Sequence, residues 1–311
     1  MKASSIHYSR DGGISVVDIE VGDPAPGEIQ VQGAACGICS WDIATCKLGA
    51  AMPRPAPPGH EGIGYVRKVG AGITGFEEGD RVLAGGFSTF GNYRVEGVHK
   101  IPQGLPDECW LGEPVSCVVT GMDTARLRAG DRVALLGCGF MGLIFAQLLV
   151  RSPLARLVAL DIDSKKLDIA KQFGVTEANL LSQGDNAERL RALKGADGFD
   201  VVIDTTGTQP GLDCATRLVA RGGQINLFGW MKGTQATFDP SAWHVNGYTV
   251  VNSAPASALR NPVPAAIRLI SEGIVDLAPL ISHVVGITGY AGLMEKIKAG
   301  EPGYIKGVVK L

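Results

Sequence analysis

An uncharged run of apolar and small residues from Val133 to Val150 most constrains how this chain folds. Its sequence, VALLGCGFMGLIFAQLLV, contains Gly137, Gly139 and Gly142 in the spacing G-x-G-x-x-G. A membrane span needs about 20 consecutive apolar residues, and the three glycines and Gln147 disfavour one here. A buried strand that ends at the first glycine, followed by a buried helix, accounts for the run better. We therefore expect no membrane span and no membrane partner.

The three glycines have different tasks in such a strand–turn–helix unit. Gly137 makes the tight turn, Gly139 lets a pyrophosphate approach the backbone, and Gly142 lets the helix pack closely. The helix N-terminus supplies N–H donors and a partial positive charge to the phosphates. The motif alone is weak, but its place between a strand and a helix predicts dinucleotide binding.

Asp161 ends the apolar segment LVALD, 19 residues after Gly142. A carboxylate at this place accepts hydrogen bonds from the adenosine ribose. It also repels a 2′-phosphate, so the sequence favours NAD over NADP. Asp163 is a second candidate beyond the strand end, and Lys166 has the reach to contact the ribose or a phosphate. The alternative is that Asp161 only caps a helix that begins at Ser164.

Apolar strands and helical segments alternate from about residue 118 onward, which predicts βαβ units and a parallel sheet. The preceding residues are rich in glycine and proline and predict short strands and loops. The expected fold class is α/β, with a β-rich domain from residues 1–117 and 255–311 and a doubly wound parallel-sheet domain from residues 118–254. The expected strands are Ile14–Ile19, Glu28–Gln32, Gly64–Val69, Arg81–Leu83, Arg132–Leu136, Leu157–Asp161, Phe199–Asp204, Gln224–Phe228 and Tyr248–Asn252; the expected helices are Met141–Val150, Ser164–Gln172, Pro210–Ala220 and Val263–Glu272.

The composition excludes several classes of protein. The 311 residues carry 29 Lys and Arg against 31 Asp and Glu, so the formal net charge is −2 and no polybasic surface suggests nucleic acid as a partner. Seven cysteines are an odd number and too few for a disulfide scaffold. The first residues, MKASSIHYSRDGG, contain no apolar segment typical of a signal peptide. We expect a cytoplasmic protein.

Two short motifs supply ligands for a candidate metal site. CGICSWD contains Cys39, and PGHEG contains His60, 21 residues later. A thiolate and an imidazole suit zinc, and a carboxylate completes the set. Glu61 and Glu113 are both candidates for that carboxylate. Three protein ligands and one exchangeable position form the pattern of a catalytic zinc site.

Two alternative roles for the cysteines fit the sequence less well. Cys36 and Cys39 match a redox C-x-x-C motif, but the βαβ unit expected beside such a motif lies elsewhere in the chain. A structural zinc site with four thiolates needs one more cysteine than Cys36, Cys39 and Cys46 provide.

Six segments together resemble the zinc-dependent medium-chain dehydrogenase/reductase family, which includes alcohol, sorbitol, threonine and related polyol dehydrogenases. They occur in the family's order over nearly the whole chain, and the combination of GHE with G-x-V-x-x-V-G and GDRV is highly specific. The segments are ACGICSWD, PGHEGIGYVRKVGAGITGFEEGDRV, EPVSC, AGDRVALLGCGFMG, VALDIDSKKLDIAKQFG and DVVIDTTG.

The resemblance implies a GroES-like β domain plus a Rossmann domain, with Cys39 and His60 as zinc ligands. The third ligand falls on Glu113 or, as in the sorbitol-dehydrogenase branch, on Glu61, and the sequence does not choose between them. Cys36 is then a buried structural thiol, and we expect a homodimer or homotetramer. The expected cofactor contacts are Gly137, Gly139, Phe140, Met141, Gly142, Asp161, Lys166, Thr205, Phe228, Trp230 and Ser253.

The sequence departs from the family pattern in three ways. The segment GGFSTFGNYRVEG replaces a four-cysteine lobe, so we expect one zinc per chain. Trp41 stands where the family usually has a serine or threonine that relays the substrate proton, and Ala44 stands where it often has a relay histidine. Ser40, Thr45 or water are the candidates for replacing this relay.

Trp41 itself has two interpretations. It offers a stacking face to a sugar ring near the catalytic metal, or it only packs under its loop. Phe87, Phe90 and Trp230 are further candidates for the wall of a substrate pocket.

The sequence therefore predicts a zinc-dependent oxidoreductase that transfers a hydride between NAD and a secondary alcohol or a polyol or cyclitol. The missing relay favours one alternative, a redox-neutral epimerase or lyase that retains NAD and uses transient oxidation. A second alternative is a non-catalytic NAD-binding protein, in which an intact set of metal ligands has no role.

Overall fold

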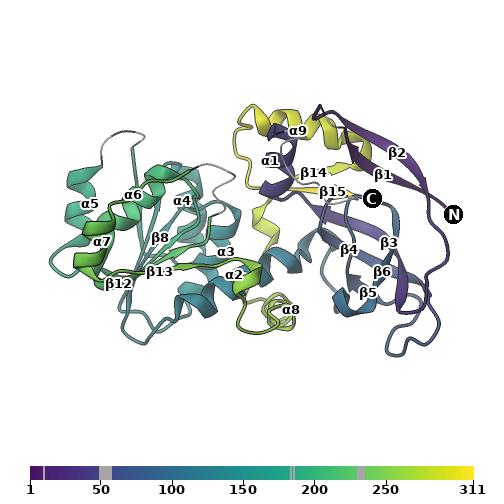
Figure 1. Ribbon diagram of the computed structural model, residues 1–311, viewed down its shortest axis with the longest axis horizontal. Helices are drawn as coiled ribbons and strands as arrows, with labels where there is room; N and C mark the ends of the chain where they lie inside the picture. The colour runs from purple at the N-terminus through teal and green to yellow at the C-terminus, as the bar shows by residue number, and fades with distance from the viewer. Residues whose placement is uncertain (10, 49–57, 183, 185, 230–234) are drawn as a thin grey trace. The chain divides into compact units, whose positions relative to one another are not determined.

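Two units organise the chain in a computed structural model that describes residues 1–9, 11–48, 58–182, 184, 186–229 and 235–311 (Figure 1). One unit consists of Met1–Pro114 and Ala266–Leu311, and the other of Val115–Ala265. The domain boundaries expected from the sequence, after residues 117 and 254, remain a proposal about where independently folding domains end.

The second unit is built on a parallel sheet whose strand order is β10-β9-β8-β11-β12-β13 within the described residues. The first strand in sequence, β8, lies inside the sheet, and the chain reverses its direction of winding between β8 and β11. This is the strand order of doubly wound nucleotide-binding folds, which hold ligands at the carboxyl ends of the strands at the reversal. The strands are β8 (Arg132–Leu136), β9 (Arg156–Asp161), β10 (Glu177–Leu180), β11 (Phe199–Asp204), β12 (Val219–Leu227) and β13 (Thr249–Asn252).

Helices connect these strands, and apolar side chains of both kinds of element form the core of the unit. The connecting helices are α3 (Phe140–Leu149), α4 (Ser164–Gln172), α5 (Ala187–Lys194), α6 (Gln209–Leu218) and α7 (Pro240–Asn246). Two further helices contain the unit boundaries: α2 (Gly112–Ala125) begins in the first unit, and α8 (Val263–Ser271) begins in the second unit and continues into the first. The apolar run of the sequence forms β8 and α3, and no helix among the described residues is long and apolar enough to cross a membrane.

The first unit is mainly β, as expected. Its larger sheet has the order β14-β15-β3-β4-β5-β7, with β6 also paired to β3, and a separate hairpin joins β1 to β2. The strands are β1 (Lys2–Tyr8), β2 (Ile14–Glu20), β3 (Glu28–Gly37), β4 (Glu61–Val69), β5 (Arg81–Leu83), β6 (Phe90–Arg94), β7 (His99–Lys100), β14 (Ile281–Gly286) and β15 (Lys306–Lys310); the helices are α1 (Ser40–Leu48) and α9 (Tyr290–Lys298).

The last strand of the chain lies beside one of the first. β15 pairs in parallel with β14 and antiparallel with β3, with Val308 opposite Gly37 (Figure 1). On its other side, β3 pairs antiparallel with β4, with Gly37 opposite Glu61. Residues near 37, 61 and 306 are therefore neighbours in one sheet, although they are far apart in the sequence.

Several expected boundaries were wrong: β4 begins at Glu61 and not at Gly64, β12 begins at Val219 and not at Gln224, and two further element ends also differ. The first long strand continues to Gly37 instead of ending at Gln32, because both of its neighbours extend the pairing there. The helix expected to run to Ala220 ends at Leu218, and β12 already begins at Val219, where the backbone is extended. Pairing between strands that are distant in sequence decides both ends.

The turn between β8 and α3 explains the glycine spacing. Gly137 has φ +88°, a left-handed conformation that favours glycine. A Cβ on Gly142 would lie 2.0 Å from the carbonyl oxygen of Gly137, so the close approach of α3 to the turn needs a residue without a side chain. Gly139 has φ −69° and open space around it, so a methyl group at this position would have no atom within 4 Å.

The two glycines Gly142 and Gly139 should respond differently to alanine. We predict that Gly142→Ala lowers the free energy of unfolding, because overpacking against a backbone atom costs about 1–3 kcal/mol. Gly139→Ala should change it by no more than about 0.5 kcal/mol, since its methyl group meets nothing. Urea unfolding of both variants tests this, and an unchanged midpoint for Gly142→Ala would show that the turn relaxes without cost.

Candidate metal centre and nucleotide site

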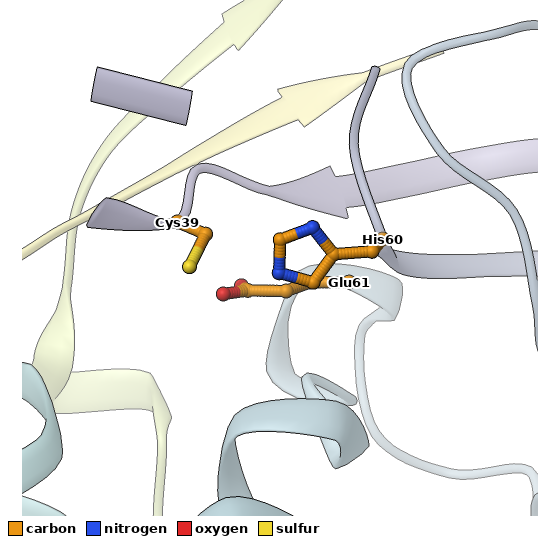
Figure 2. Close-up of side chains that lie close together, drawn as sticks. All are labelled: Cys39, His60 and Glu61. Atoms are coloured by element: carbon orange, nitrogen blue, oxygen red, sulfur yellow. The ribbon is translucent and has the colours of Figure 1, made fainter. Parts of the chain in front are cut away.

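Three potential metal ligands meet in the first unit. The Sγ of Cys39, an imidazole nitrogen of His60 and a carboxylate oxygen of Glu61 all lie within 4.8 Å of one another, and Figure 2 shows the three side chains pointing toward each other. Cys39 follows the end of β3 and precedes α1, whereas His60 directly precedes β4 and Glu61 is its first residue. Pairing of β3 with β4 brings these two strand ends together.

The Cys39 thiol is held by the backbone around it. The Trp41 N–H donates to Sγ at 3.4 Å, and the Cys39 N–H donates to Oδ2 of Asp42 at 2.8 Å. Burial raises the pKa of the Cys39 thiol to about 12, and the negative charge of Glu61 acts in the same direction. A divalent cation reverses this preference, because a coordinating thiol is deprotonated by the metal.

The Glu61 carboxylate forms a buried ion pair with Lys306. Its side chain is buried, and Nζ of Lys306 donates to Oε1 at 2.8 Å. Nζ also lies 2.5 Å from Oε2, but this contact lacks hydrogen-bond geometry, and Oε2 has no hydrogen-bond partner among the described residues. Burial opposes the charge on Lys306, while the attraction of Glu61 raises its pKa. The Glu61 carboxylate is therefore held in its ionised form by a buried cation, and one of its oxygens lies close enough to the ligand atoms of Cys39 and His60 to share a metal ion with them.

The donor set also fits zinc. One sulfur, one imidazole nitrogen and one carboxylate oxygen are ligand types that zinc accepts, and three protein ligands leave a position open. Glu113 lies in the first turn of α2 and belongs to no such group of ligand atoms within the described parts of the chain. All seven cysteines are free, and Cys36 is buried in the core of the first unit.

The residues expected near a proton relay have other contacts. Trp41 is partly buried in the first turn of α1, and Ala44 is buried. The Thr45 hydroxyl donates to the Trp41 carbonyl oxygen at 2.8 Å, so its proton is already engaged, while Ser40 is exposed. The sequence did not identify the buried carboxylate of Asp42, whose pKa burial raises to about 6.

Phe87 does not line a pocket, which corrects the expectation from the sequence. Its side chain is fully buried, and its ring centroid lies 4.8 Å from that of Tyr290 in the core. Phe90 is partly buried at the start of β6, and Trp230 lies outside the described residues.

The nucleotide motif lies at the carboxyl end of β8 in the second unit, followed directly by α3. Asp161 ends the neighbouring strand β9, and its carboxylate accepts N–H groups of Cys138 at 2.5 Å and Asp163 at 2.8 Å. Asp163, not Asp161, caps α4 by accepting the Lys165 N–H. The helix-cap alternative for Asp161 is therefore wrong. Lys166 lies 3.9 Å from Asp163.

The remaining candidates for cofactor contacts differ in their surroundings. Thr205 follows β11, and its hydroxyl donates to the carbonyl oxygens of Leu136 and Gly137. Phe228 packs edge-on against Phe145, with ring centroids 4.8 Å apart. In contrast, the Ser253 hydroxyl is buried and bonded to Asn226 and Thr124, which makes it part of a polar network inside the unit. Within α3, Phe140 is buried and Met141 is partly buried.

Lys306 is the other residue that the sequence analysis missed. The tail YIKGVVKL contains two cations, Lys306 and Lys310, and the sequence shows neither which of them is buried nor which carboxylate pairs with it. The partner, Glu61, follows only from the pairing of β15, β3 and β4.

Comparisons with known proteins match both units. A family model described as the alcohol dehydrogenase GroES-like domain matches residues 25–113, and one described as zinc-binding dehydrogenase matches residues 141–272. D-arabinitol dehydrogenase 1 from Uromyces fabae is 25% identical, over 94% of this chain and 93% of its own. Sorbitol dehydrogenase from Halalkalibacterium halodurans is also 25% identical, over 90% of this chain and 91% of its own.

Solved structures share the fold. The crystal structure of 2R,3R-butanediol dehydrogenase from Bacillus subtilis superposes with a TM-score of 0.85 at 22% identity, over 99% of each chain. The two family models lie in the same order as the GroES-like and Rossmann segments expected from the sequence. The chain belongs to the zinc-dependent medium-chain dehydrogenase/reductase family.

Proposed function

We propose that the protein is a zinc-dependent oxidoreductase that transfers a hydride between NAD and a secondary alcohol, with a polyol or cyclitol as the preferred substrate class. The observation that carries this proposal is the group formed by Cys39, His60 and Glu61, whose potential ligand atoms all lie within 4.8 Å of one another. The nucleotide motif at the carboxyl end of β8 supports it independently.

Zinc, when bound, supplies a Lewis acid that polarises the substrate oxygen. Cys39, His60 and Glu61 would hold it, and their proximity supports Glu61 over Glu113 as the third ligand. In the other unit, the N-terminus of α3 would bind the pyrophosphate, and the space beside Gly139 would admit it. Asp161 would accept hydrogen bonds from the ribose.

The names of the relatives support a polyol substrate. The two relatives compared above are dehydrogenases of arabinitol and sorbitol, both polyols. Trp41, beside the ligand Cys39, would offer a flat apolar face to a ring substrate. An assembly of two or four copies and a cytoplasmic location remain predictions from the sequence.

A substrate screen tests the proposed function directly. Sugars, cyclitols, amino alcohols and simple alcohols are incubated with the zinc-loaded protein and NAD, and NADH absorbance is followed. Sustained NADH formation with a polyol is the expected result. Tightly retained NAD without net turnover would favour a redox-neutral epimerase or lyase instead, and a protein that binds NAD but no zinc would overturn the proposal.

The metal content should be close to one zinc per chain. We predict that Cys39→Ala and His60→Ala lose this zinc while the protein stays folded, because each removes one of three ligands. Glu113→Gln, the matched control, should keep it. Elemental analysis with circular dichroism checks these outcomes. Two tightly held zinc ions per chain, or loss of zinc in Glu113→Gln, would contradict the proposed ligand set.

The protein should bind NADH at least tenfold more tightly than NADPH. A carboxylate facing a 2′-phosphate costs at least ~1.4 kcal/mol, which is a factor of ten. Asp161→Ser should reduce the difference in affinity between NADH and NADPH. Asp163→Asn should leave this difference unchanged, because Asp163 caps α4. Fluorescence titration with both nucleotides measures the ratio. Equal affinities of the unmodified protein for NADH and NADPH would contradict this prediction.

Trp41 should favour polyols over simple alcohols. General acid–base catalysis typically raises the reaction rate by ~10²–10⁴-fold. Where the usual proton relay is absent, a neighbouring hydroxyl of the substrate would supply part of this proton transfer. We expect vicinal polyols or cyclitols to react faster than ethanol-like substrates. Trp41→Ser should raise activity on simple alcohols and raise KM for ring substrates. If kinetics on both substrate classes do not change in Trp41→Ser, its side chain is only packing.

A further inference from the structure

A buried ion pair connects two strands that are not neighbours. Lys306 begins β15 and Glu61 begins β4, and β3 lies between these strands in the sheet. Both side chains are almost fully buried, at 5% and 2% exposure. The pair therefore has to reach across the middle strand without leaving the interior.

Gly37 makes this reach possible. It lies on β3 directly opposite Glu61, and a Cβ at this position would stand 2.0 Å from Oε2 and 3.1 Å from Cδ of Glu61. Its φ is not in the left-handed region, so the backbone does not require a glycine here. The available space requires a glycine instead, because the Glu61 carboxylate occupies the volume that a side chain at residue 37 would fill.

The ammonium group of Lys306 is also fixed to the segment that carries Cys39. Nζ donates to the carbonyl oxygen of Ile38 at 2.9 Å as well as to Oε1 of Glu61 at 2.8 Å. Ile38 is the residue between Gly37 and Cys39. The Lys306 ammonium group thus connects the Glu61 carboxylate to the backbone next to the Cys39 thiol.

The charges give this arrangement a second effect. A thiolate at Cys39 and a carboxylate at Glu61 together carry two negative charges, which would neutralise a divalent ion. The buried cation of Lys306 leaves the whole group with a net positive charge. In a low-dielectric interior such a charge acts strongly at short range.

We propose that Lys306 is a positioning residue for the metal centre: its ammonium group contacts the Glu61 carboxylate, whose Oε2 lies over Gly37, and so fixes the orientation in which this carboxylate meets Cys39 and His60. This inference rests on the proposed function, because it assumes that Glu61 binds the metal. Groups that orient metal ligands typically contribute 10–100-fold to metal affinity. The role differs from a purely structural ion pair, because it predicts a change at the metal itself.

Cobalt(II) substitution tests the role, since its visible spectrum reports the ligand set. The affinity and spectrum are compared in the unmodified protein, Lys306→Met, Lys306→Arg and Lys310→Met. Lys310, on the same strand, is exposed and pairs with Glu108, so it is the matched control. We expect Lys306→Met to weaken Co(II) binding at least about tenfold and to alter the spectrum. Lys306→Arg should keep most of the Co(II) affinity and a similar spectrum. Lys310→Met should change neither the affinity nor the spectrum.

The same comparison in a Glu61→Gln background separates positioning from general electrostatics. There, Lys306→Met should cause no further loss, because the ligand that it positions is already gone. An equal loss in that background, or an unchanged affinity and spectrum in Lys306→Met, would overturn the proposal.

Gly37→Ala keeps the charges of Lys306 and Glu61, and it provides the test of the positioning role if Lys306→Met does not fold. It should displace the carboxylate, weaken Co(II) binding and change the spectrum, and an unchanged spectrum would again overturn the role. Failure of the proposed function looks different, because then the unmodified protein itself would not bind one equivalent of Co(II).

Discussion

The buried ion pair between Glu61 and Lys306 is the interaction on which the arrangement of the first unit depends. Leaving one member of a buried pair without its partner typically costs about 3–5 kcal/mol. The pair forms only if the C-terminal strand β15 inserts beside β3 and if residue 37 lacks a side chain. The end of the chain is therefore tied to the segment that carries Cys39, and this connection gives the candidate metal centre a rigid support.

In the second unit, too, a neighbouring group packs closely against a residue that has no side chain. Gly142 lets α3 approach the turn after β8, and Gly37 lets a carboxylate lie against β3. In both cases the neighbouring strands and helices fix the groups that would meet a ligand. The backbone N–H groups at the start of α3 and the carboxylate of Glu61 are held in place before any ligand arrives, which lowers the entropic cost of binding.

Much of the fold could be predicted from local patterns. The strands Arg132–Leu136 and Phe199–Asp204 and the helix Ser164–Gln172 have the bounds expected from the sequence, because apolar runs and helix-capping signals define them. The residue types of Cys39, His60 and Glu61 were enough to suggest a metal site. Lys306 could not be linked to this site, because its partner depends on the pairing of three strands. Burial likewise placed Phe87 in the core, and a neighbouring aspartate took the capping role considered for Asp161.

The central claim is that Cys39, His60 and Glu61 form one metal centre, and X-ray absorption spectroscopy of the protein loaded with one zinc tests it most directly. The account predicts a single sulfur at about 2.3 Å, together with nitrogen and oxygen ligands at about 2.0–2.2 Å. It also predicts that the sulfur signal disappears in Cys39→Ala. Two or more sulfur ligands would contradict the account, because Cys36 or Cys46 would then have to bind the metal. A shell of oxygen atoms alone would contradict it as well.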